Sequence, residues 1–304
     1  MKKYLLKIGL FFAIIILVDV GFGKACKQLI AYARGGAMKQ VDMTVHEQTA
    51  DIVILGSSRA HHHYVPAVLQ DTLGLTAYNG GVDGNGIVLA KGLYTVLLNR
   101  YHPKVLVYDI TNSFDFNGNS SDGSYSTYLG FLRPYFYEEG VKDVVARVDK
   151  NERYKNLSTM FRYNSKIVDL IKDQLVGRLY SDGYEPSYGE LKEERPIFND
   201  DVMPIDTTKM NMLKGIIDQS KSANVEIVFV ASPKYSVANS STYEAFRELC
   251  DREQVEFWDY YCDPKFQRTD FFADGVHLND KGAHVFTADV AYRMKLHLAE
   301  KGVI

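Results

Sequence analysis

The sequence predicts an α/β protein, a doubly wound parallel sheet of five strands with helices on both faces. Short apolar runs rich in β-branched residues alternate along the chain with stretches of helical spacing. Such alternation is typical of strand–helix–strand units, which build a parallel sheet. The first three apolar runs end in polar or glycine-rich residues, and in sheets of this class ligands bind beyond the carboxyl ends of the strands.

Each element is expected from its own pattern. The strands are expected at 51–56, 75–78, 104–110, 225–231 and 255–260, where apolar residues run together. The helices are expected at 65–72, 87–100, 206–223, 241–252 and 281–299, where apolar residues recur at helical spacing. Together these elements form a domain over 51–304.

A long stretch without strands interrupts the alternation between about 117 and 204. It is rich in Tyr, Gly and charged residues, and helical patterns occur near 139–149 and 158–176. A loop of this length with no structure of its own would be unusual. We therefore expect a partly helical insertion, placed over the active face of the sheet.

The N-terminus differs from the rest of the chain. Three lysines open it: Lys2, Lys3 and Lys7. An apolar run over 8–18 follows, and charge before an apolar core is typical of an export signal. A helix over 8–23 would be about 24 Å long, short of the roughly 30 Å hydrocarbon layer. We expect a membrane anchor or signal segment over 1–23 and a juxtamembrane linker or short helix over 24–50, which places the domain on the extracytoplasmic, periplasmic side.

Two questions about this exported state stay open in the sequence. Gly23-Lys24-Ala25 loosely fits a small-x-small cleavage site, although Lys24 favours an uncleaved anchor over a removed signal or a lipid-modified Cys26. Cys250 and Cys262 fit either a disulfide or two buried thiols.

Composition limits the classes of partner. The chain has 304 residues and a net charge of −3, with no basic stripe. Nucleic-acid binding requires such a stripe, so we expect no nucleic-acid partner. The length suits one large domain, or one domain with an embedded segment.

Gly56-Ser57-Ser58-Arg59 follows the first expected strand. A serine at this turn is exposed at the carboxyl edge of the sheet, above a helix N-terminus that favours negative charge. It can act as a nucleophile, although serine is also the commonest helix N-cap. Arg59 is a candidate ligand for an anionic group of a substrate, or a partner for a surface carboxylate.

Asp274-Gly-Val-His277 lies in the loop before the last helix. A serine nucleophile needs a general base, and that base needs an acceptor to orient it. An aspartate and a histidine three residues apart can supply both from one loop.

Two further residues follow neighbouring strands. Gly84 lies after the second strand, where its N–H can approach a substrate because no side chain intervenes. Asn112 lies after the third strand, and its amide can donate to an oxyanion. Taken singly, each is equally a turn residue.

These blocks, in this order, resemble the SGNH hydrolases, also called GDSL esterases. Gly56-Ser57-Ser58 is similar to their Gly-Asp-Ser, Gly84 and Asn112 to the second and third blocks, and Asp274 with His277 to the last. The resemblance covers about 51–112 and 225–299. It implies a flavodoxin-like sheet, a triad of Ser58, His277 and Asp274, and an oxyanion hole formed by the Ser58 N–H, the Gly84 N–H and the Asn112 side chain.

The resemblance also suggests a reaction. It implies an esterase that needs no cofactor and removes acyl groups, preferably O-acetyl, from a cell-envelope glycan. The chain departs from the family at Ser57, Arg59 and in the block around Asn112, which is Ile-Thr-Asn-Ser here. An acyltransferase, or a catalytically silent glycan-binding or assembly module on the same fold, is therefore carried as an alternative.

His61, His62 and His63 raise the question of a metal site. Consecutive side chains of a helix point in different directions, so the three cannot easily share one ion. We expect no metal, and one or two of these rings facing the cleft, with His62 as a candidate substrate contact.

Overall fold

Five parallel strands form one sheet at the centre of the molecule. In the computed structural model, which describes residues 1–118, 125–176, 182–192, 204–235 and 240–304, the strand order is β2-β1-β3-β4-β5. The strands are β1 (Ile52–Gly56), β2 (Ala77–Asn79), β3 (Val105–Asp109), β4 (Glu226–Ala231) and β5 (Glu256–Asp259). This order is the flavodoxin-like one, so the predicted α/β class and parallel sheet are confirmed.

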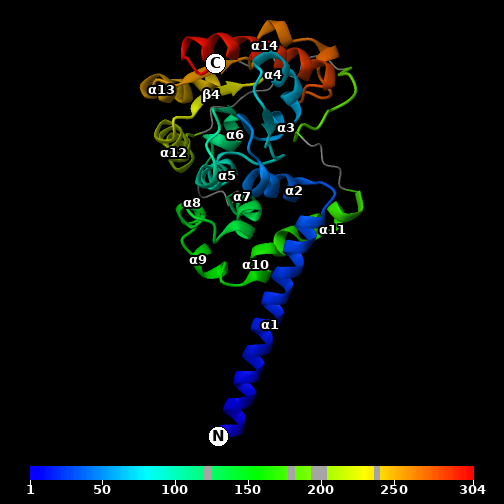
Figure 1. The fold of residues 1–304 in the computed structure, drawn as a ribbon, viewed down its shortest axis with the longest axis vertical. Coiled ribbons are helices and arrows are strands. Elements are labelled where there is room, and N and C mark those ends of the chain that lie inside the picture. Colours follow the sequence, from blue (N-terminus) through cyan, green and yellow to red (C-terminus); the bar gives the residue numbers. More distant parts are fainter. Residues whose placement is uncertain (119–124, 177–181, 193–203, 236–239) are drawn as a thin grey trace.

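Helices cover both faces of the sheet (Figure 1). One layer holds α3 (Ser58–His63), α4 (Pro66–Leu73) and α14 (Asp280–Glu300). The other holds α5 (Ile87–Arg100), α12 (Thr207–Ala223) and α13 (Glu244–Glu253). Alternate residues of each strand point into these two layers, so Val53 and Leu55 join one apolar core while Ile52 and Ile54 join the other. Both faces of the sheet are buried under helices, which explains why the strands are apolar throughout.

The remaining helices lie beyond α5 or connect the strands. They are α1 (Lys2–Tyr32), α2 (Ala37–Asp42), η1 (Met43–Glu47), α6 (Asn112–Asp115), α7 (Tyr125–Leu132), η2 (Arg133–Tyr135), α8 (Val141–Val148), α9 (Glu152–Lys155), α10 (Thr159–Tyr163), η3 (Asn164–Lys166), α11 (Ile167–Val176), η4 (Ser240–Tyr243), η5 (Pro264–Phe266) and η6 (Thr269–Phe271).

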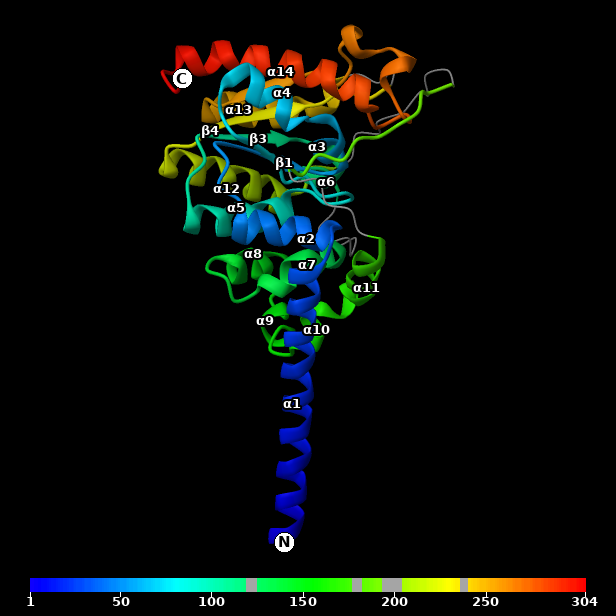
Figure 2. The same ribbon diagram turned by 45° about the vertical axis from the view of Figure 1, so that its right-hand side comes forward.

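The helical part of the β3–β4 connection lies in a different place from the one we expected. Helices α7 to α11 form a layer on the far side of α5, between the sheet and the exposed half of α1 (Figure 2). They do not cover the carboxyl edge of the sheet, because the apolar sides of α7 and α8 pack on α5. Part of the expected segment 117–204 lies outside the described residues.

Helix α1 is long and apolar enough to cross a membrane, by length and composition. It runs to Tyr32, beyond the expected boundary at residue 23. The expected linker over 24–50 is mostly helical and packed against the domain: Met38, Val41 and Val45 are buried in the core. Their helical spacing buries one face of α2 and η1, so this stretch belongs to the folded domain.

Candidate active site

The turn after β1 separates two neighbouring serines. Gly56 adopts φ +147°, and a Cβ there would lie 2.6 Å from the Asp109 carbonyl oxygen, so only glycine allows this tight exit from the strand. Ser57 is 1% exposed, and its Oγ lies 3.0 Å from Thr111 Oγ1. Ser58, the first residue of α3, is partly exposed. Of the two, only Ser58, the candidate nucleophile, is accessible to solvent.

Ser58, His277 and Asp274 form one chain of hydrogen bonds. His277 Nε2 lies 2.8 Å from Ser58 Oγ, and His277 Nδ1 lies 2.9 Å from Asp274 Oδ2. The other carboxylate oxygen accepts the N–H groups of Val276 (2.7 Å) and His277 (2.8 Å). The network assigns the proton to Nδ1, leaving Nε2 to accept the serine proton. Ser58 and His277 are 219 positions apart in the chain, and they meet because α3 lies against the loop before α14.

The environment of Asp274 favours its charged form. Burial acts to raise the pKa of this carboxyl group, but the hydrogen bonds from the His277 ring and from the Val276 and His277 N–H groups outweigh it, and the pKa is lowered. Asp274 is therefore ionised at neutral pH, and its negative charge can stabilise an imidazolium at His277.

A second, buried histidine supports the loop that carries His277. His63 is fully buried; its Nε2 accepts the Leu278 N–H at 3.0 Å, and its Nδ1 donates to Ser232 Oγ at 3.0 Å. Burial, followed by the charges of His277 and Arg59, lowers the pKa of His63 well below its usual value. His63 is therefore a neutral positioning residue. No separate role was predicted for His63; the only signal in the sequence was the run of three histidines.

His62, the candidate substrate contact, lies beside His277. Its ring centroid is 5.6 Å from that of His277, and its Nδ1 donates to the Glu185 carbonyl oxygen at 2.7 Å. Burial acts to lower the pKa of His62, but the Asp83 carboxylate and the Glu185 backbone outweigh it and raise the pKa. A positive charge is thus favoured next to the candidate nucleophile.

Among the described residues, one group near the triad can hold a metal ion. Donor atoms of His61, His62 and Asp83 lie within 4.8 Å of one another. The group holds two of the three consecutive histidines and leaves His63 out; Asp83 contacts His61 Nδ1 at 2.8 Å and His62 Nε2 at 3.4 Å. In this arrangement Asp83 already serves both rings as hydrogen-bond acceptor.

The two remaining candidates for the oxyanion hole lie at the same edge of the sheet. The loop that carries Gly84 is tied to the end of β1, because the Val82 N–H donates to the Gly56 carbonyl at 3.1 Å. Gly84 is exposed, with φ +65°, a left-handed conformation that glycine adopts without strain. Asn112 begins α6, and its Nδ2 donates to Thr242 Oγ1 at 2.8 Å. This bond uses one of the two N–H donors of the amide, and the other remains for an oxyanion.

Arg59 does not face the site. It is 2% exposed, and its guanidinium donates to the carbonyls of Ser232 (3.1 Å) and Ile110 (2.5 Å). It also lies 3.6 Å from the buried carboxylate of Asp109. The next residue along a helix points about 100° away, which directs Arg59 under the strand ends while Ser58 faces the solvent. Arg59 therefore does not make the expected contact with an anionic group of a substrate. It instead holds together the ends of the strands.

A segment from the β3–β4 connection also borders the triad. The Asp280 N–H donates to the Ser187 carbonyl at 2.7 Å, and the Leu191 N–H donates to the Phe272 carbonyl at 2.8 Å. Residues 182–192 thus run beside α3 and the His277 loop, although they contain no regular element. Their sequence, rich in turn formers, held no signal for this contact.

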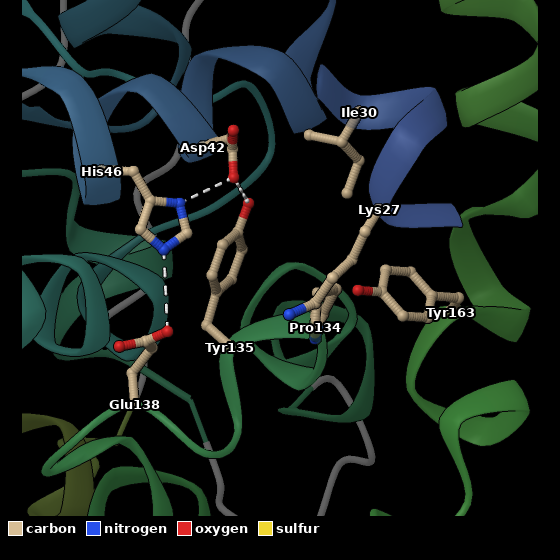
Figure 3. Close-up of a pocket in the computed structure, with 8 residues that line it drawn as sticks. All are labelled: Lys27, Ile30, Asp42, His46, Pro134, Tyr135, Glu138 and Tyr163. Atoms are coloured by element: carbon tan, nitrogen blue, oxygen red, sulfur yellow. Dashed lines mark hydrogen bonds and ion pairs between the residues drawn. The ribbon is translucent and has the colours of Figure 1, made fainter. Parts of the chain in front are cut away.

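A polar cavity lies elsewhere, where α1 and α2 meet the connection (Figure 3). Its volume is about 180 Å³. Asp42 accepts hydrogen bonds from His46 Nδ1 (2.9 Å) and the Tyr135 hydroxyl (3.2 Å), and His46 Nε2 lies 3.6 Å from Glu138. The hydrogen bond to Asp42 raises the pKa of His46. These groups satisfy one another, so the cavity forms part of the joint between α1 and the domain.

The arrangement at the sheet edge suits nucleophilic chemistry. A partly exposed hydroxyl, an imidazole and a carboxylate are linked in order, at a helix N-terminus and at the carboxyl ends of parallel strands. No protein-family model matches the chain, and the comparison with curated proteins gave no match.

Proposed function

We propose that this protein is a serine esterase of the SGNH/GDSL type that acts on ester-linked acyl groups. The observation that carries the proposal is the unbroken hydrogen-bond chain from Ser58 Oγ through His277 to Asp274. The ordered blocks at Gly84 and Asn112, at the same sheet edge, support it. Decay of an unused site would not be expected to leave all three members of such a chain in register.

The reaction follows from the proton positions. His277 Nε2 takes the proton of Ser58 as its Oγ bonds to the ester carbonyl carbon, and the carbonyl electron pair moves onto oxygen. The N–H groups of Ser58 and Gly84 and the Asn112 amide stabilise that oxyanion. His277 returns the proton to the leaving alkoxide, which gives an acyl group on Ser58. Water, activated by His277, then releases the acid; a sugar hydroxyl in place of water would make the enzyme an acyltransferase.

We further propose that the substrate is an acylated, preferably O-acetylated, glycan of the cell envelope. The support is topological: α1 can cross a membrane, and the lysines at its start favour the cytoplasmic side, which puts the domain outside. Such a domain meets envelope polymers, and a neutral ester substrate agrees with the absence of a basic stripe.

The test is turnover of p-nitrophenyl acetate by the full chain in detergent. We expect Ser58→Ala and His277→Ala each to lower kcat by several orders of magnitude, to background. The matched control is Ser57→Ala, which removes a buried hydroxyl one residue away and should keep most activity. Equal rates for the native protein and the Ser58→Ala variant would exclude simple esterase activity.

A further inference from the structure

Helix α1 and helix α10 are joined by a side chain that lies in the N-terminal membrane segment. Asp19 accepts hydrogen bonds from Ser158 Oγ (2.6 Å), from the N–H groups of Thr159 (2.8 Å) and Met160 (2.9 Å), and from Thr159 Oγ1 (2.8 Å). Those N–H groups are the first donors of α10, which have no partner inside the helix. Asp19 therefore caps α10 from a position about 140 residues away in the chain.

Close packing continues along α1 beyond this cap. A Cβ at Gly23 would lie 2.7 Å from Thr159 Cβ, so the absence of a side chain at Gly23 makes room for the Thr159 side chain against α1. Cys26 and Ile30, one and two turns further on, are buried in the main core. The second half of α1 is thus a fixed part of the domain, and its first half must follow the same axis.

The exposed apolar part of α1 is too short to cross a bilayer alone. From Tyr4 to Val20 its large apolar side chains are exposed. Seventeen residues span about 25 Å, whereas the hydrocarbon layer is roughly 30 Å thick. The lysines at the start fix that end at the headgroups, so the layer must extend past Asp19, to about the level of Gly23. At that depth a carboxylate needs partners, and α10 supplies them.

The corner between α9 and α10 carries exposed apolar side chains at this level. Leu157 is 68% exposed, Tyr154 59% and Met160 44%. Both ribbon views place α9 and α10 at the end of the domain from which α1 emerges (Figures 1 and 2). Lys24 and Lys27, on the next turns of α1, are exposed as well. Exposed apolar side chains close to a tyrosine and lysines are the combination of groups that occurs at a bilayer interface.

We propose that this corner, residues Tyr154 to Met160, is seated in the bilayer, with Leu157 and Met160 among the upper acyl chains and Tyr154 at the headgroups. The inference rests on α1 crossing the membrane, as proposed above, and is independent of the chemistry at Ser58. The lipid is the fitting occupant because the patch is continuous with the lipid-facing surface of α1. The domain is then attached to the membrane at two points, α1 and this corner. Together they fix the tilt of the domain and the height of the sheet edge above the membrane.

The test is quenching of tryptophan fluorescence by lipids brominated on their acyl chains. The chain has one tryptophan, Trp258, which is 1% exposed and gives a constant background. Leu157→Trp is compared with Leu10→Trp, in the apolar part of α1, and with Tyr292→Trp, which lies on α14 at the opposite end. All three native side chains are exposed, so each variant should fold, and an unchanged Trp258 emission spectrum checks this. The full chain is reconstituted in vesicles of phosphatidylcholine and phosphatidylglycerol.

We expect the brominated lipids to quench most of the fluorescence that the introduced tryptophan of Leu157→Trp adds to that of Trp258. Bromine near the headgroup end of the acyl chains should quench it more than bromine near the methyl end. Leu10→Trp should be quenched more by the deeper bromines, and Tyr292→Trp should lose nothing. Quenching of Leu10→Trp alone, with Leu157→Trp at the level of Tyr292→Trp, would overturn the seating of the corner. If neither Leu10→Trp nor Leu157→Trp were quenched, α1 would not cross the bilayer, and the seating of the corner would be overturned with it. The esterase proposal would not be affected.

Discussion

Ser57 and Ser58 show how one residue step changes the surroundings of a hydroxyl group. Both hydroxyls follow the same strand, yet Ser57 Oγ is buried against Thr111 whereas Ser58 Oγ meets His277. The same step turns Arg59 inward, where it is held by backbone carbonyls at the ends of β3 and β4. The sequence indicated Ser58 as the candidate nucleophile because the blocks align on it. It could not indicate the burial of Arg59, because an arginine is exposed unless distant partners surround it, and those partners come from positions 110 and 232.

At Asn112 we predict a loss of rate rather than of binding. Asn112→Ala removes a donor to the oxyanion and should lower kcat for p-nitrophenyl acetate about 100-fold or more, with little change in KM. Thr242→Ala, which frees the Asn112 amide from its present acceptor, should leave kcat unchanged or raise it. A rise in KM with unchanged kcat for Asn112→Ala would place Asn112 outside the oxyanion hole.

His63 makes stability depend on pH in a defined direction. Its pKa is well below the usual value of about 6.5 in the folded state, so the unfolded chain binds the proton more readily. The stability that His63 contributes is therefore present above pH 6.5 and is lost as the pH falls below it, by up to about 1.4 kcal/mol per pH unit. In His63→Gln, which is neutral but keeps an acceptor and a donor, the free energy of unfolding should fall less between pH 7 and 5. In the control His102→Gln, at an exposed position, the free energy of unfolding should change with pH as in the native protein. If it also did so in His63→Gln, the role given to His63 would be wrong.

At the scale of elements, the strands and most helices were predictable because their patterns are local. The apolar run of β1 lies within one residue of the expected 51–56, and α5 has the expected bounds of 87–100. The short helix α3 was implied by the helix N-terminus expected at Ser58, but its bounds were not predicted, since six residues give too little periodicity. The path of α7 to α11 depends on contacts with α1 and α5, which no local pattern encodes.

Arg59 should matter to the stability of the elements it joins. Arg59→Met leaves the Asp109 carboxylate buried without its cationic partner, which should lower the free energy of unfolding by roughly 3–5 kcal/mol. The double variant Arg59→Met/Asp109→Asn should regain part of that loss. Native stability in chemical denaturation together with an altered KM would instead restore Arg59 as a substrate contact.

At the scale of the whole molecule, the sheet, the membrane segment and the β3–β4 connection form one unit. The sheet gathers Ser58, Gly84 and Asn112 at one edge, because parallel strands all end there. On the other side, α5, the helices of the connection and α1 follow in layers toward the proposed bilayer (Figure 2). The disulfide considered from the sequence is not formed, because Cys250 is a free thiol. Its side chain is buried in the core, and burial raises the pKa of this thiol to about 12.

Covalent labelling shows whether Ser58 is an activated nucleophile. The full chain in detergent is treated with a fluorophosphonate, which loses fluoride when a serine oxygen attacks phosphorus, and the adduct is located by peptide mass spectrometry. We predict one adduct, on Ser58, formed far more slowly in His277→Ala and normally in Ser57→Ala. Labelling without turnover of simple esters would favour the acyltransferase, whereas a native protein that stays unlabelled at Ser58 would contradict the account and leave a silent binding module on this fold.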